Sequence, residues 1–324
     1  MEETLNILTN VNLHPSLLEA IEQAAAPARV WKEMDKERFW QKLPDAHILF
    51  GSRFPPRTGQ APQLRWVQLF SAGADLLNGS DIIESNVLIT TVSGAHSIAV
   101  SEHVISLMLL FTRHWPQLLA LQQAGHWARR DEWSELLDYE LFGRTVAIIG
   151  LGNIGRRVAQ LCKALGLRVL ASSRTIPDGG SDYNVDQFFV AENLHAMLGQ
   201  AHFVVICVPS TALTRHLIAE AELRAMRPDA FLINISRGAV LDQEMLLKAL
   251  DQGWLRGAGL DVVEEEPLPD GHPILTHPKI VVSPHIAGWT KRYAEHAVAV
   301  FCNNLKLFRK GEPLRNIYDR QRSY

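Results

Sequence analysis

The stretch RTVAIIGLGNIGRRVAQLCKALGLRVLASSR, residues 144–174, decides the fold of this chain. An apolar run at 144–150 leads into a glycine-rich turn. The turn opens a helical segment over Ile154–Leu165, and a second apolar run follows at 167–172. Continuous apolar strands that alternate with helices are typical of a parallel sheet covered on both faces. The stretch therefore predicts one strand–helix–strand unit of such a sheet.

The same alternation continues toward the C-terminus. Helical segments such as Gln243–Gln252 separate further strand-like runs at 203–209, 230–236, 257–263 and 279–285. Because crossover connections of this kind join parallel strands, the six runs predict one doubly wound domain. A helix near Thr290–Phe308 follows it.

The first ninety residues predict a smaller α/β unit. Helical stretches such as Ser16–Ala26 mix there with short apolar runs at 46–50, 64–70 and 87–92. From Ser97 the pattern indicates one long helix through about Gln123. Its stretch Val104–Phe111 is apolar nearly all round, so it either runs through a domain core or lies in a subunit interface.

Composition is that of an ordinary globular chain long enough for about two domains. It has 324 residues, 47% of them hydrophobic, and 32 basic against 35 acidic residues give a net charge of −3. A near-neutral chain is no electrostatic match for nucleic acid or an anionic membrane surface. The most apolar helical stretch, Val104–Thr112, is too short to span a bilayer, and MEETLNILTN lacks the apolar core of a signal peptide. We therefore expect a cytoplasmic protein that binds neither nucleic acid nor membrane.

The cysteines and histidines indicate neither a disulfide framework nor a metal site. Cys162, Cys207 and Cys302 are odd in number, far apart and include no CxxC pair. Cys207 lies inside an apolar run, where we expect a buried, inert thiol. The 13 histidines include no HExxH or other recognised ligand spacing, so we expect no metal.

The turn from Gly150 to Gly155 predicts dinucleotide binding. Gly150 permits the tight turn, Gly152 lets the backbone approach a pyrophosphate, and Gly155 lets helix and strand pack closely. Backbone N–H groups at the helix start, at Asn153 and Ile154, hold the phosphates together with the helix dipole.

The end of the next strand chooses between the two nicotinamide dinucleotides. An NAD-specific site has Asp or Glu there, whereas this chain reads Ser172-Ser173-Arg174-Thr175, with no carboxylate before Asp178. A guanidinium and hydroxyl groups suit a 2′-phosphate. This segment therefore predicts a preference for NADP(H), held by Ser173, Arg174 and Thr175, with NAD(H) as the alternative. The structural alternative is that Arg174 is only a solvated arginine on a loop.

Three polar residues stand at the ends of other predicted strands. Arg237 follows FLINIS, Glu266 closes LDVVEEE, and His285 closes IVVSPH. Each alone also fits a structural role: a surface arginine, a solvated acidic run or a capping histidine. Because ligands of open α/β sheets bind beyond the carboxyl ends of the strands, the three together predict a catalytic site.

The ordered motifs of the chain resemble those of the D-isomer-specific 2-hydroxyacid dehydrogenases. The matching segments are GLGNIG, NISRGAVLD, GLDVVEEEPLP and SPHIAG, together with SAGADLL at 71–77 and SGAHSIAVSEHVISLMLLFTR at 93–113. The resemblance covers nearly the whole chain. SSRT and the ending DRQRSY are most similar to the glyoxylate/hydroxypyruvate reductase branch.

The resemblance implies an α/β fold in which one domain is inserted in another. A doubly wound Rossmann nucleotide domain, 95–286, would lie within a smaller flavodoxin-like substrate domain made of 1–94 and 287–324. It also implies a homodimer without a metal. Arg237, Glu266 and His285 are its catalytic set; Ala72 and Gly73, with Arg237, bind the substrate; and Val208, Pro209, Ile235, Ser236 and Asp261 line the nicotinamide.

The activity implied is hydride transfer from NADPH to a small 2-oxo acid, giving the D-2-hydroxy acid. Physical chemistry supports these roles. Reduction leaves negative charge on the carbonyl oxygen, to which an imidazolium at His285 can donate a proton, and a carboxylate at Glu266 favours that imidazolium. Arg237 can bind the substrate carboxylate and polarise the ketone. The alternatives are NAD-dependent oxidation of a D-2-hydroxy acid and a non-catalytic nucleotide-sensing protein of the same family.

The substrate itself is not determined by the sequence. We expect pocket walls from Phe50–Phe54, Phe70 and Trp289, with Arg53 as a second polar contact. Trp289 replaces a smaller residue that the branch tends to have. We expect Glu102 and His103 to hydrogen-bond between the two domains.

Overall fold

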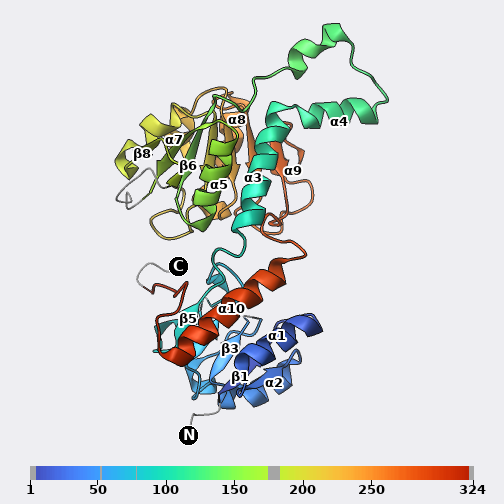
Figure 1. The fold of residues 1–324 in the computed structure, drawn as a ribbon. Coiled ribbons are helices and arrows are strands. Elements are labelled where there is room, and N and C mark those ends of the chain that lie inside the picture. Colours follow the sequence, from blue (N-terminus) through green and yellow to red (C-terminus); the bar gives the residue numbers. More distant parts are fainter. Residues whose placement is uncertain (1–4, 52, 78, 174–182, 321–324) are drawn as a thin grey trace. The chain divides into compact units, whose positions relative to one another are not determined.

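The computed structural model describes residues 5–51, 53–77, 79–173 and 183–320, and the chain forms two compact units (Figure 1). Unit 1 comprises Met1–His96 and Trp289–Tyr324, and unit 2 comprises Ser97–Gly288. The boundaries fall after residues 96 and 288, close to the expected ones after 94 and 286.

Unit 1 is a parallel five-stranded sheet in the order β2-β1-β3-β4-β5, the flavodoxin-like order of a doubly wound sheet. Its strands are β1 (Asn6–Thr9), β2 (Arg29–Lys32), β3 (Ile48–Phe50), β4 (Trp66–Gln68) and β5 (Leu88–Thr90). Its α-helices are α1 (Pro15–Ala25), α2 (Lys36–Lys42) and α10 (Tyr293–Lys310).

Helix α10 brings the C-terminal part of the chain into the core of unit 1. The ring of Phe301 stacks on Phe50, with centroids 4.4 Å apart, and on Trp66, with centroids 5.3 Å apart. Leu305 is buried in the same apolar cluster. The two sequence segments of unit 1 therefore share one core.

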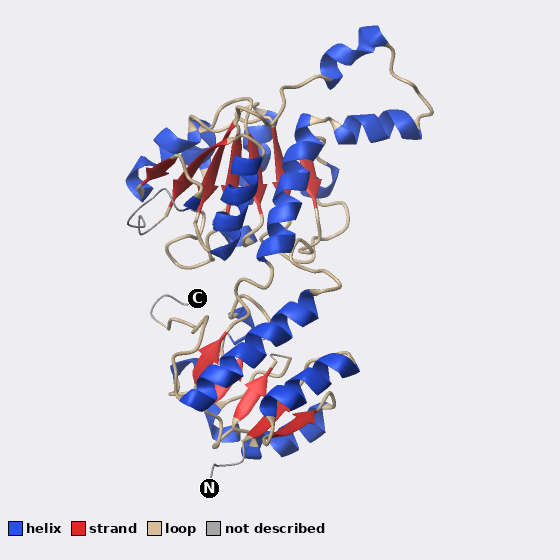
Figure 2. Cartoon of the chain, viewed as in Figure 1, coloured by secondary structure: helices blue, strands red, loops and turns tan. Residues whose placement is uncertain are grey.

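Unit 2 is a parallel seven-stranded sheet in the order β12-β11-β10-β9-β6-β7-β8, with helices on both faces (Figure 2). Its strands are β6 (Thr145–Ile149), β7 (Arg168–Ser172), β8 (Gln187–Phe189), β9 (Phe203–Ile206), β10 (Phe231–Asn234), β11 (Gly257–Leu260) and β12 (Ile280–Val282). Its α-helices are α3 (Ser97–Thr112), α4 (Trp115–Gln123), α5 (Asn153–Ala164), α6 (Leu194–Leu198), α7 (Glu220–Ala225), α8 (Gln243–Asp251) and α9 (Pro273–Thr276).

Alternating residues of the central strands of unit 2 pack into two different cores. Ala147 and Ile149 of β6 belong to one buried cluster, whereas Val146 and Ile148 belong to another. Because successive side chains of a strand point to opposite faces, both faces of the sheet are covered. This confirms the predicted doubly wound Rossmann architecture.

Two expectations about unit 2 were wrong in detail. The sheet has a seventh strand, β8, which is only three residues long and was not predicted from the sequence. The long helix expected over 97–123 breaks at His114, where φ is +52° and the chain bends by 65° between α3 and α4. Pro116 lies in the first turn of α4, where its missing N–H leaves no hydrogen bond unmade.

Helix α3 is buried on one side only. Val104, Leu107, Met108 and Phe111 lie in the core of unit 2, whereas Leu109 is 40% exposed in the single chain, so the expected burial in a subunit interface stays a prediction for that side of the helix. Figure 1 shows α4 and the following segment leading away from the sheet before the chain returns to β6. None of the described helices is by itself long and apolar enough to cross a membrane; α3 and α4 meet that criterion only as a bent pair.

Candidate functional site

The predicted site residues of unit 2 gather at the carboxyl edge of its sheet. The chain proceeds from β6 outward to β7 and β8, and then returns to β9 on the other side of β6. The edge between β6 and β9 is therefore the topological switch point, where open α/β sheets bind ligands. The residues that leave the strands at this edge are Gly150, Val208, Pro209, Ile235, Ser236, Arg237, Asp261 and His285.

The glycine turn after β6 has the shape that a dinucleotide requires. A Cβ atom on Gly155 would lie 2.0 Å from the carbonyl oxygen of Gly150, so only glycine lets α5 approach the strand this closely. Gly152 caps α5, and a Cβ there would meet nothing within 4 Å. Space beside the backbone, and the backbone N–H groups of Asn153 and Ile154 at the start of a twelve-residue helix, fit a pyrophosphate.

The segment after β7 is described only as far as Ser173, which is partly buried. Arg174 and Thr175 lie outside the described residues.

Arg156, in the first turn of α5, is a cation beside the glycine turn that was not predicted from the sequence. Its guanidinium lies 4.3 Å from the centroid of the Tyr183 ring, and its Nε donates to the Leu151 carbonyl inside the glycine turn. The paired arginines directly after the third glycine were the available signal.

His285 and Glu266 form a close pair. Nδ1 of His285 lies 2.7 Å from Oε2 of Glu266, and the two side chains are 44% and 35% exposed. Because a carboxylate accepts the Nδ1 proton, Nε2 is the ring nitrogen left to exchange a proton with a substrate. Oε1 of Glu266 accepts from the Val263 backbone N–H at 3.1 Å, which fixes the carboxylate from its other side.

Arg237 follows β10 on a loop that packs directly against the loop after β11. A Cβ on Gly238 would lie 1.9 Å from the carbonyl carbon of Val263, so this approach requires glycine. Nη1 of Arg237 donates to the Ser236 carbonyl at 2.8 Å. The cation is thereby held on the loop beside the segment that carries Glu266.

Asp261 is buried, and its carboxylate accepts hydrogen bonds from the segment that carries His285. Its expected contact with the nicotinamide stays a prediction.

His103 hydrogen-bonds to Ser283 at 3.1 Å, and both residues belong to unit 2. This bond lies within unit 2, and the expected bond of His103 between the two domains stays a prediction.

The expected substrate residues of unit 1 lie on a loop that follows β4. Ala72 and Gly73 are partly buried there, and the Ser71 hydroxyl donates to the Gly73 carbonyl at 2.7 Å. The guanidinium of Arg53 lies over the Phe54 ring. Trp289 is exposed and packs its ring at a tilt on Tyr293, with the centroids 4.7 Å apart.

The described residues indicate neither cysteine chemistry nor metal binding at this edge. Burial raises the pKa of the Cys207 thiol to about 12, so it is protonated and unreactive. Within the described ranges no three His, Cys, Asp or Glu side chains are grouped as metal ligands would be.

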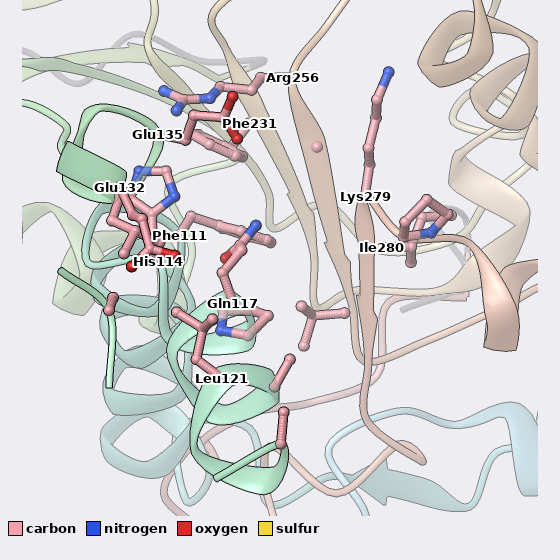
Figure 3. A pocket seen from close by; sticks show the side chains of 18 residues that line it. Phe111, His114, Gln117, Leu121, Glu132, Glu135, Phe231, Arg256, Lys279 and Ile280 are labelled. Atoms are coloured by element: carbon pink, nitrogen blue, oxygen red, sulfur yellow. The ribbon is translucent and has the colours of Figure 1, made fainter. Parts of the chain in front are cut away.

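A cavity of about 700 Å³ lies at the other edge of the sheet, where the strands begin (Figure 3). Its lining includes His114, Gln117, Glu132, Arg256 and Lys279. Beside it the buried carboxylate of Asp138 accepts hydrogen bonds from Arg144 and Arg256. Arg144 precedes β6 and Arg256 precedes β11, so this cavity is separate from the predicted site.

The chain is similar to known proteins in sequence and in fold. A family model described as D-isomer specific 2-hydroxyacid dehydrogenase, NAD binding domain, matches residues 105–287. The chain is 32% identical to the glyoxylate reductase of Thermococcus gammatolerans over 293 residues, which cover 87% of this chain and 86% of the relative. It is also 32% identical to the glyoxylate reductase of Pyrococcus furiosus over 301 residues, with the same coverage of 87% and 86%.

Solved structures share the whole architecture. A D-isomer specific 2-hydroxyacid dehydrogenase family protein from Aeromonas salmonicida has a TM-score of 0.85 at 28% identity, covering 98% of this chain and 100% of that one. A D-isomer specific 2-hydroxyacid dehydrogenase from Xanthobacter autotrophicus, in complex with NADPH and MES, has a TM-score of 0.83 at 25% identity, covering 99% and 100%.

Fold, glycine turn and relatives together define an oxidoreductase that uses a nicotinamide cofactor. The chain belongs to the D-isomer-specific 2-hydroxyacid dehydrogenase family, in its glyoxylate reductase branch.

Proposed function

We propose that this enzyme reduces a small 2-oxo acid of the glyoxylate/hydroxypyruvate type to the D-2-hydroxy acid, with NADPH as the preferred cofactor. The observation that carries the proposal is the 2.7 Å contact between His285 and Glu266 at the same sheet edge as the glycine turn. A histidine held by a carboxylate at its Nδ1 is a proton donor suited to the oxygen of a carbonyl under reduction.

Each side chain has a distinct task in this proposal. When bound, the reduced nicotinamide supplies the hydride. His285 donates the proton on Nε2 to the substrate carbonyl oxygen, and the Glu266 carboxylate stabilises the imidazolium before the transfer. Arg237 pairs with the substrate carboxylate and draws charge toward the carbonyl oxygen. Backbone N–H groups of Ala72 and Gly73 also bind the substrate carboxylate.

The preference for NADPH rests on the absence of an acidic residue after β7. Ser173 stands where an NAD-specific site has Asp or Glu, and Arg174 and Thr175 follow. Arg156 adds a second guanidinium beside the glycine turn. The Xanthobacter relative was solved with NADPH, which supports the same choice.

Turnover of glyoxylate and hydroxypyruvate with NADPH and with NADH tests the proposal. We expect NADPH to give the higher kcat/KM, and Arg174→Ala to raise the KM for NADPH while NADH serves as the internal control. A wild type that prefers NADH and oxidises D-2-hydroxy acids favours the second function, an NAD-dependent dehydrogenase. Nucleotide binding without turnover of any 2-oxo or 2-hydroxy acid favours a sensing protein.

We propose a homodimer whose contact includes the segment from α4 to the start of β6, here called the arm (residues 115–142). Large apolar side chains are exposed along it, and two are almost fully so: Trp127 is 90% and Phe142 81% exposed. The others are Trp115, Leu119, Trp133, Leu137 and Tyr139. Apolar surface of this extent is typical of protein interfaces.

Sedimentation at low micromolar concentration tests the assembly. The wild type should exceed the 36.3 kDa of one chain, whereas a Trp127→Glu/Leu137→Glu variant should approach it. Leu213→Glu, at an equally exposed residue outside the arm, is the control and should remain a dimer. A wild type that sediments as one chain would contradict the proposal.

A cytoplasmic location remains our proposal. All three cysteines are free thiols, which suits a reducing compartment. Fractionation of the source cells is the measurement that checks it.

A further inference from the structure

The segment that carries His285 is held in an unusual conformation. Residues 283–287 leave the end of β12, and His285 adopts a left-handed backbone with φ of +52°. Residues with a Cβ rarely adopt this conformation, and it persists where neighbouring groups fix it. The orientation of the His285 ring therefore depends on what holds these five residues.

Asp261 is the group that holds them. Its Oδ1 accepts from the Ser283 hydroxyl at 2.6 Å and from the Ile286 N–H at 2.9 Å. The Ala287 N–H lies within hydrogen-bond distance of both carboxylate oxygens, at 3.2 and 3.1 Å. The backbone carbonyl of Asp261 accepts from the His285 N–H at 2.8 Å. The buried aspartate thus binds the segment on both sides of His285.

The hydrogen bonds of Ser283 determine the role of a third residue, His103. The Ser283 hydroxyl has one proton, and a carboxylate only accepts, so that proton goes to Asp261. Nε2 of His103, 3.1 Å from the same hydroxyl, must then be the donor to Ser283. The result is a directed chain from His103 on α3, through Ser283, to Asp261. None of these hydrogen bonds involves the glycine turn.

We propose that His103 and Ser283 are positioning residues for the proton donor: through Asp261 they hold residues 283–287 so that the His285 ring meets Glu266. This rests on the proposed function of His285. Loss of the Ser283 hydroxyl removes one of the hydrogen bonds that the Asp261 carboxylate accepts. It also leaves the His103 Nε2 proton without the acceptor that it has in the wild type. The His285 ring then spends less time on Glu266, so the proton is transferred less often while the cofactor binds as before.

The test uses full-length variants and steady-state reduction of glyoxylate by NADPH. Ser283→Ala should lower kcat about tenfold, move the alkaline limb of the kcat/KM profile to lower pH and leave the KM for NADPH unchanged. Ser283→Thr, which keeps the hydroxyl, should restore most of the rate. His103→Leu should lower kcat severalfold, and His103→Gln, whose amide can donate from a similar place, should recover it. Ser106→Ala is the control: the hydroxyl of this serine on α3 donates to the His103 backbone carbonyl at 2.7 Å rather than to the His103 ring, so the variant should leave kcat unchanged.

A double variant separates positioning from general damage. Because both residues act through one chain, Ser283→Ala/His103→Leu should lose no more activity than Ser283→Ala alone. Losses that multiply, or a Ser283→Ala enzyme with the wild-type rate and pH profile, would overturn the proposal.

A measurement without turnover keeps the two proposals distinguishable. Imidazole NMR of the folded wild type and Ser283→Ala, with His285 assigned from a His285→Gln spectrum, should show that the variant broadens or shifts the His285 signals. Unchanged signals refute the positioning role. Changed signals in a protein that reduces no 2-oxo acid would support the positioning role and contradict the proposed function.

Discussion

Two of the histidine–carboxylate pairs of unit 2 have the same backbone conformation at the histidine but opposite surroundings. His285 beside Glu266 and His114 beside Asp138 both have φ of +52° at the histidine. At the carboxyl edge the two groups are 2.7 Å apart, and their side chains are 44% and 35% exposed. At the amino edge His114 and Asp138 are 3.9 Å apart, and their side chains are only 8% and 4% exposed.

The difference shows that a histidine–carboxylate pair is not by itself a catalytic site. The Asp138 carboxylate already forms ion pairs with Arg144 and Arg256. Burial is the largest cause that lowers the pKa of His114, and the positive charge of Arg256 is the second. His114 is therefore uncharged at neutral pH. Glu266 has no such arginine bond among its hydrogen bonds in the described structure, and its charge is available to the imidazole of His285.

The largest contrast is expected from removing each histidine. His285→Ala should lower kcat by about 10²–10⁴-fold, the range of a general acid, because it removes the proton donor of the proposed mechanism. His114→Ala should leave kcat of the folded enzyme near the wild-type value. Steady-state kinetics of the two variants compare them directly. Near-wild-type turnover by His285→Ala would exclude the proposed mechanism.

The carboxylates should show the reverse contrast in stability. Asp138→Asn leaves the buried Arg144 guanidinium without its counter-charge, which should lower the free energy of unfolding by about 3 kcal/mol. Glu266→Gln, at a partly exposed position, should change it by less than about 1 kcal/mol. Denaturant titrations of both variants give the values. Equal losses would mean that Asp138 is no more structural than Glu266.

Glu266→Gln should instead change the pH dependence of reduction. The amide lacks the negative charge that favours the imidazolium, so the reductive kcat/KM should begin to fall at lower pH than in the wild type. NADPH binding should change little. The measurement is the pH profile of kcat/KM, with hydride transfer shown to be rate-limiting by a deuterated cofactor. Superimposable profiles would show that the pair does not act as described.

The smallest effect is expected from the buried histidine, in the pH dependence of stability. The pKa of His114 is lower in the folded chain than its ordinary value of 6.5. The unfolded chain therefore binds a proton first as pH falls, and His114 lowers stability on acidification below about pH 6.5. His114→Gln should lose less stability than the wild type between pH 7 and pH 5. Parallel stability curves would show that His114 does not titrate differently on folding.

Much of unit 2 could be predicted because its signals are local. The glycine turn, the apolar strands and the polar residues that follow them all lie within short stretches of sequence. The predicted strands ran too long at their carboxyl ends: β9 ends at Ile206 although the apolar run continues through Val208. Residues beyond the ends remain apolar because they line the sheet edge, so composition alone does not mark where pairing stops.

The positions of long-range partners were beyond the sequence. His103 and Ser283 are 180 residues apart, and their hydrogen bond follows from where α3 packs rather than from any motif. The same holds for Asp138 and Arg256, which are 118 residues apart. The sequence did not predict the break at His114, because α3 and α4 are both apolar and resemble one continuous helix. The sequence signal for the break is Pro116, which lies in the first turn of α4.

The discontinuity of unit 1 has a consequence for synthesis. When the first 96 residues leave the ribosome, the rings of Phe50 and Trp66 lack their stacking partner, because Phe301 is still about two hundred residues away. Unit 2 is continuous in sequence and can fold during that interval. The nascent N-terminal segment must therefore wait with exposed aromatic surface while a whole domain is made, which gives chaperones a defined segment to protect.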